Sequence, residues 1–167
     1  RCGFLGPLHM EIVQERLERE FGMNLITTCP NVSYYVKTKK GEDIQINNPT
    51  DMPESGDIES IFEPYIKGEI IVPPEYIGGI MKLCNSKRAT YISTNYLSTD
   101  KAQLYYKMPL GEIIYDFFEK LKSTSRGYAS FDYEVTEEKV GKLVKLDVFI
   151  SGEIVDALSI IVHKENA

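Results

Sequence analysis

The chain has 167 residues, of which 43% are hydrophobic and 26% are charged, a balance typical of a globular protein with one ordinary domain or two small ones. Its formal net charge of -6 excludes a protein that binds nucleic acid over its whole surface, because such binding needs Lys and Arg to neutralise phosphates. Any RNA contact must therefore be a local patch, and the composition gives no reason to expect DNA as a partner.

Cysteine usage and hydropathy indicate the compartment. The three cysteines, Cys2, Cys29 and Cys84, are odd in number and lack CxxC spacing, which argues against a disulfide framework or a thiolate metal site. The longest apolar runs are far shorter than the roughly 18 residues that span a membrane, and Arg1 begins no charged leader. We expect a cytoplasmic protein without a targeting segment.

The first third of the chain predicts a helix followed by strands. Apolar residues recur at helical spacing over residues 7–21, with Gly22 after them, and predict a surface helix with one buried stripe: Met10, Val13, Leu17 and Phe21. Residues 24–29 read as a strand, and a hairpin follows, with strands at 32–38 and 44–47. The turn-forming composition of residues 47–57 predicts a linker.

From residue 61 the predicted order is strand, helix, strand, strand, helix, strand. With right-handed crossovers this order gives an α+β fold, a ferredoxin-like split βαβ sandwich over residues 61–136. The paired glycines Gly78 and Gly79 suggest that the first helix packs closely against the sheet. The second helix is predicted to open at Pro109 and end at Gly127, with these residues inward: Leu110, Ile113, Ile114, Phe117 and Leu121. Residues 143–164 predict a last β-hairpin.

Catalytic motifs are not found in the sequence. It contains no GxxxxGK[ST] phosphate loop, no GxGxxG after a strand and no GxSxG elbow. His9-Met10-Glu11 fits the H-x-E of zinc deaminases, but the P-C-x-x-C that must accompany it is missing. With His163 as the other histidine, a His-based metal site or triad is not supported, and we expect no catalytic, cofactor or metal site in this chain.

One motif resembles an RNA-binding signature. Residues 126–129, Arg-Gly-Tyr-Ala, match the first four places of the RNA-recognition-motif sequence K/R-G-F/Y-G/A-F-V-x-F/Y. Ser130 then replaces the stacking aromatic, and the motif lies on the strand after the second helix rather than before it. Alternation puts four residues on one face of this strand, most simply the face that the helices cover: Ala129, Phe131, Tyr133 and Val135.

Five long stretches of the chain are distinctive: CGFLGPLHMEIVQERLEREF, INNPTDMP, EPYIKGEIIVPPEYIGGIMKLCNSKR, MPLGEIIYDFFEKLKSTSRGYASFDYE and LVKLDVFISGEIVDALSIIVH. They closely resemble successive segments of the LepA family of translational GTPases, in the family's order. The related BipA/TypA group, which lacks the SRGYASFDYE and VDALS segments, is the alternative, and a free-standing RNA-binding module is the alternative from another class.

The resemblance implies a carboxy-terminal fragment that lacks the GTPase domain. It implies that residues 1–30 are the second half of a ferredoxin-like third domain, 31–60 a hairpin and linker, 61–136 the equivalent of the fifth domain of EF-G, and 137–167 the start of a family-specific C-terminal domain. The parent would hydrolyse GTP with Mg²⁺, bind the ribosome, and move tRNAs backward or remodel stalled complexes. Peripheral membrane association of the parent is a further implication.

Two positions depart from the family pattern. Pro7 stands where an apolar residue such as Leu is expected, and proline suits the first turn of a helix. Lys87-Arg88-Ala89 stands where the family usually has Arg-Arg-Gly. Because Ala adopts a positive φ less freely than Gly, this second departure puts the conformation of the loop in question.

The RNA contacts are predicted from the geometry of the sandwich. The end of its first helix, the start of its second strand and the end of its third strand meet at one edge, which should gather Lys82, Lys87, Arg88 and Lys107. A second basic group belongs at the opposite end: Lys120, Lys122 and Arg126. The competing interpretation is that these cations complement helix macrodipoles.

Overall fold

The computed structural model describes residues 7–25 and 32–167. Its helices and strands in chain order are α1 (Pro7–Phe21), β1 (Tyr34–Thr38), β2 (Asp43–Ile46), β3 (Ile58–Val72), α2 (Ile77–Ser86), β4 (Thr90–Ser98), β5 (Lys101–Pro109), α3 (Phe117–Thr124), β6 (Ser130–Gly141), β7 (Leu143–Leu146), β8 (Phe149–Ile150), β9 (Glu153–Ile154) and β10 (Ile160–His163).

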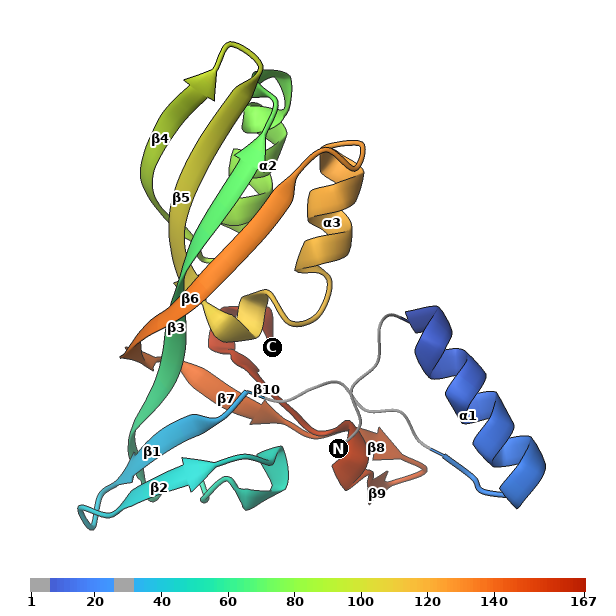
Figure 1. Cartoon of the computed structure of the whole chain (residues 1–167). Helices are drawn as coiled ribbons and strands as arrows, with labels where there is room; N and C mark the ends of the chain where they lie inside the picture. Colours follow the sequence, from blue (N-terminus) through green and yellow to red (C-terminus); the bar gives the residue numbers. More distant parts are fainter. Residues whose placement is uncertain (1–6, 26–31) are drawn as a thin grey trace.

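The ferredoxin-like unit is confirmed. Its four strands pair antiparallel in the order β6-β3-β5-β4, and α2 and α3 pack against one face of the sheet (Figure 1). This is the order that a split βαβ unit produces, because each helix connects two strands that are not adjacent.

The core of this unit follows the period of two expected for a half-buried sheet. Side chains of β3 and β5 that face the helices are fully buried, as are those of the helices that meet them: Ile66, Ile70, Leu104, Met108, Ile80, Phe117 and Leu121. Burying each such side chain contributes about 1.5–3 kcal/mol. Among the described helices, α2 and α3 both pack on this face, and none packs on the opposite face.

The glycine pair in α2 packs differently from the prediction. A Cβ on Gly79 would lie 2.7 Å from Cγ2 of Thr124 in α3, whereas one on Gly78 would meet nothing within 4 Å. Gly79 therefore allows close approach between the two helices, and not between a helix and the sheet.

The second predicted helix is shorter than expected. Residues Leu110–Glu112 form a 3₁₀ turn, and α3 begins only at Phe117. Gly127 ends the segment with φ +85°, as predicted. The inward positions Ile113, Phe117 and Leu121 are buried as predicted, because the turn keeps them over the sheet.

The β1–β2 hairpin is confirmed, and it joins the same sheet. β1 pairs with the first residues of β3, so the sheet has six strands, and β3 runs through both parts of the molecule (Figure 1). The predicted linker at residues 47–57 connects two strands of this sheet, and Pro49 within it is buried. A second apolar cluster lies here: Val32, Tyr34, Val36, Ile46, Ile61, Leu143 and Ile161.

The C-terminal segment contains two nested hairpins where one was predicted. β7 pairs with β10, and between them β8 pairs with β9. Ser151 and Gly152 connect β8 and β9 with φ of 54° and 87°, the backbone that a tight two-residue hairpin turn needs.

The buried stripe predicted for α1 is wrong. Met10, Val13 and Leu17 are half-buried and Phe21 is 70% exposed, because α1 has no extensive contact with the other described elements. Of the strand predicted at residues 24–29, Asn24 and Leu25 are not in a strand, and the remainder lies outside the described residues. Among those residues, no helix is long and apolar enough to cross a membrane.

Candidate nucleic-acid interface

Arg88 lies at the centre of a nearly buried ion-pair cluster. Its Nη1 and Nη2 donate to the two carboxylate oxygens of Glu63 at 2.8 and 2.9 Å, and its Nε donates to Glu112 at 2.8 Å. Glu63 is only 3% exposed. A bidentate guanidinium–carboxylate pair of this kind fixes orientation as well as charge.

Electrostatics hold this arginine in its charged form. Burial alone would lower the pKa of Arg88, but the hydrogen bonds and charges of Glu63 and Glu112 raise it overall. The left-handed backbone of the loop falls on Arg88, with φ 53°, and not on Ala89. Ala89 therefore needs no glycine-like conformation.

Lys87 and Lys120 share one carboxylate. Lys87 Nζ donates to Oδ1 of Asp116 at 2.6 Å, and Lys120 pairs with Oδ2 of the same residue. Hydrogen bonds from Lys120 and Lys87 lower the pKa of Asp116 to about 2. The prediction that Lys120 lies at the opposite end from Lys87 is wrong, because the late start of α3 places Lys120 in its first turn.

The other predicted contacts divide into paired and unpaired cations. Lys107 pairs with Glu137, and Lys122 Nζ donates to the carbonyl oxygen of Ala129 at 2.6 Å. Lys82 on α2 and Arg126 after α3 are exposed, and neither forms an ion pair within residues 7–25 and 32–167. Five of the seven predicted residues thus bind groups of the chain itself.

The loop between α3 and β6 is held in one conformation by its own hydrogen bonds. The buried Ser125 Oγ donates to Leu121 at 2.8 Å and accepts from the Ala129 amide at 3.0 Å. Arg126 and Gly127 both have positive φ, 51° and 85°, and the Gly127 amide donates to Lys122 at 2.7 Å. These bonds tie the loop to the last turn of α3 and to the start of β6.

This loop presents an exposed tyrosine. Tyr128 is 68% exposed, and its ring stacks on Tyr76 with the centroids 6.1 Å apart and the planes 18° from parallel. Tyr76 itself is half-buried and packs against the main core. Sequence reasoning missed this pair because the two residues lie far apart in the chain, and only the RGYA match pointed to Tyr128.

The strand that follows keeps the predicted alternation, but only the first half of that face is covered as predicted. Ala129 is buried and Phe131 packs against Phe117 and Phe118 of α3. Tyr133 and Val135 are exposed instead of covered, although they pair with Gly68 and the buried Ile66 of β3; in the described sheet β6 pairs with β3 alone and so lies at its edge.

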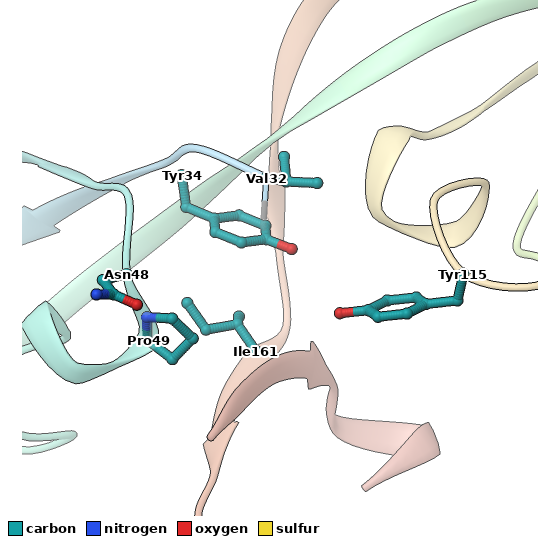
Figure 2. A pocket seen from close by; sticks show the side chains of 6 residues that line it. All are labelled: Val32, Tyr34, Asn48, Pro49, Tyr115 and Ile161. Carbon is teal, nitrogen blue, oxygen red and sulfur yellow. The ribbon is translucent and has the colours of Figure 1, made fainter. Parts of the chain in front are cut away.

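A small cavity lies beside the Arg88 cluster. Figure 2 shows the hydroxyls of Tyr34 and Tyr115 pointing toward one another across it. Burial, followed by the charges of Tyr115 and Glu63, raises the pKa of Tyr34. The cavity measures about 10 Å³, enough for one water and too small for a substrate. It is lined by Val32, Tyr34, Asn48, Pro49, Tyr115 and Ile161.

A larger hollow of about 190 Å³ lies on the sheet face without helices. It is lined by Lys67, Glu69, Tyr105, Asp132, Tyr133 and Glu134. Its carboxylates outnumber its one cation, so it repels phosphate. No group of three or more metal-ligating side chains capable of holding an ion occurs in the described part of the chain.

The fold and sequence define the class. Residues 60–147 match the family described as "Elongation factor G C-terminus", and the chain belongs to this family. Over all 167 residues it is 53% identical to Elongation factor 4 of Shouchella clausii, and 54% identical to the proteins of that name from Halalkalibacterium halodurans and Symbiobacterium thermophilum. The chain spans 27–28% of the length of these relatives.

Proposed function

We propose that this chain is the ribosome-binding part of an elongation factor 4 (LepA) type translational GTPase, which moves tRNAs backward or remodels stalled ribosomes. The observation that carries the proposal is the identity of 53–54% over the entire chain to relatives named Elongation factor 4. GTP and Mg²⁺ would be bound by another part of the parent protein, which we expect to act in the cytoplasm. The proposal does not extend to membrane association.

The seven cations predicted to contact RNA differ in whether they already have a partner in the chain. Lys82 and Arg126 are exposed and form no ion pair in the described ranges, so they are the cations best able to neutralise phosphate. Lys87, Lys107, Lys120 and Lys122 have partners in the chain, and would contact RNA only while keeping or exchanging them. We assign Arg88 a structural role, in which its ion pairs stabilise the fold next to the proposed interface.

Ribosome binding tests the proposal directly. The chain is mixed with bacterial ribosomes and its co-sedimentation is measured at several salt concentrations. The double variant Lys82→Glu, Arg126→Glu should bind more weakly, and its salt dependence should be shallower by about one unit of slope for each lost phosphate contact. Lys40→Glu, at the exposed tip of the β1–β2 hairpin, is the charge-matched control for the single variants Lys82→Glu and Arg126→Glu, and it should bind like the wild type. Absence of ribosome binding by the wild-type chain would overturn the proposal.

A GTPase assay tests whether the catalytic activity of the parent lies outside this chain. The purified chain should not hydrolyse GTP above background, because it contains no phosphate-cradling loop sequence. GTP turnover by a clean preparation would contradict the division of roles.

A further inference from the structure

The Tyr76–Tyr128 pair has the geometry of a platform. Tyr76 is anchored on the core and Tyr128 lies on it in a stack, so the outer ring face of Tyr128 is presented to solvent. The hydrogen bonds of Ser125 and Lys122 fix the loop, and none of them uses the Tyr128 side chain. A ligand that stacks on this ring would meet a surface that is already ordered, which lowers the entropic cost of binding.

Positive charge lies beside the platform. Arg126 precedes Tyr128 by two residues and forms no ion pair among the described residues. A hydrogen bond to Glu75 is the main reason that the pKa of Tyr76 is raised, and the opposing charge of Arg126 acts on the same hydroxyl, so the guanidinium lies within electrostatic reach of the pair. Lys122 is held against the carbonyl oxygen of Ala129 in the same loop.

We propose that Tyr128, supported by Tyr76, is a stacking site for an unpaired RNA base, and that Arg126 contacts the adjoining phosphate. Sequence-tolerant recognition of single-stranded RNA combines these two parts, because every base has a π-face and every nucleotide a negative charge. The inference rests on the proposed ribosome binding for its biological partner, and it names the chemistry of one contact.

The test uses two probes of equal charge. Binding of the chain is measured to a ten-nucleotide oligoadenylate and to an abasic strand of the same length, at several salt concentrations. The wild type should prefer oligoadenylate. Tyr128→Ala should weaken oligoadenylate binding by about 5- to 150-fold and leave abasic binding unchanged, since stacking on one aromatic side chain accounts for that range. Arg126→Ala should weaken binding of both probes and flatten their salt dependence.

Matched variants keep the test specific. Tyr128→Phe retains the ring and should bind within about twofold of the wild type, because stacking does not need the hydroxyl. Tyr96 lies on β4, is also 68% exposed, and stacks on no other ring among the described residues, so Tyr96→Ala should have no effect. Equal affinity of the wild type for the two probes, or an unchanged affinity of Tyr128→Ala for oligoadenylate, would overturn the stacking site.

The same variants separate this inference from the proposed function. Suppose that the chain binds ribosomes and that Tyr128→Ala binds both ribosomes and oligoadenylate with the same affinity as the wild type. The stacking site is then wrong and the proposed function stands. If oligoadenylate binding depends on Tyr128 while ribosome binding is absent, the proposed function is wrong and the stacking site stands.

Discussion

Each of the two helices of the ferredoxin-like unit is followed by an arginine in the same backbone conformation, but the two arginines differ in their contacts. Arg88 follows α2 and Arg126 follows α3, and both have a left-handed backbone, with φ of 53° and 51°. Arg88 binds Glu63 and Glu112, whereas Arg126 forms no ion pair in the described ranges. The same residue type in the same backbone conformation is thus structural at one helix end and available to a partner at the other. Position and charge alone do not distinguish the two roles; the carboxylates nearby do.

The largest expected effect comes from Arg88→Met. This change leaves Glu63 buried without a counter-charge, which should lower the free energy of unfolding by about 3–5 kcal/mol. Urea denaturation followed by circular dichroism measures it. Arg126→Met is the matched control and should change the free energy of unfolding by less than about 0.5 kcal/mol. Equal losses for the two variants would remove the distinction between the two helix ends.

The next effect concerns a buried polar group with no hydrogen-bond partner in the described part of the chain, the opposite of the well-paired Arg88. Tyr106 is fully buried, and its hydroxyl has no hydrogen-bond partner among the described residues. Tyr106→Phe should therefore raise the free energy of unfolding by about 1 kcal/mol, because an unsatisfied buried hydroxyl carries a desolvation cost. A loss of stability in the same urea titration would show that the hydroxyl is satisfied in solution.

A smaller effect should follow from relieving backbone strain at only one of the two arginines. Arg126→Gly removes the cost of a left-handed backbone at a residue with a side chain, about 1–2 kcal/mol. Glycine also raises the entropy of the unfolded chain, which lowers stability by about 0.4–1 kcal/mol. The net gain should be roughly 0.5–1 kcal/mol. Arg88→Gly gains the same relief but loses the three hydrogen bonds to the two carboxylates, so it should destabilise. Thermal melting of the pair gives the comparison, and a shift of the same sign in both would contradict it.

The smallest expected effect is a loss of folding stability at acidic pH. The pKa of Asp116 is held at about 2, below its usual 3.8, so the folded state binds this proton less readily than the unfolded state. The stabilisation is complete above about pH 4 and should be lost as the pH falls through about 2. Because Asp116 is 39% exposed, solvent screens the effect. Asp116→Asn should flatten this part of the curve of stability against pH, and an unchanged curve would show that the lysine contacts are not formed in solution.

Local patterning predicted most of the fold. The order of strands and helices over residues 61–136 follows from periods of two and 3.6 in the apolar residues, together with Pro and Gly at the boundaries. The break between Pro109 and α3 was missed, since Leu110 in the 3₁₀ turn and Ile113 directly after it stay inward as they would in a helix. The stripe on α1 was misjudged, because periodicity shows that a face is apolar and not what covers it.

The candidate site was less predictable, because its determinants are distant in sequence. Lys87 and Arg88 were correctly placed at a helix end, but their carboxylate partners come from other elements and appear only in the folded chain. Tyr76 was not considered as a partner of Tyr128 for the same reason. The RGYA match at residues 126–129 pointed to the loop of the proposed stacking site, while its strand position argued against RNA binding.

Photocrosslinking on the ribosome tests the central claim most directly. Replacing Tyr128 by p-benzoylphenylalanine places a photoreactive ring at the proposed platform, and the same replacement at Tyr96 gives an equally exposed control. After irradiation of the ribosome complex, crosslinks from position 128 should map to ribosomal RNA, and position 96 should give none. Crosslinks to RNA from position 96 but not from position 128 would contradict the assignment of the loop after α3 as the RNA contact.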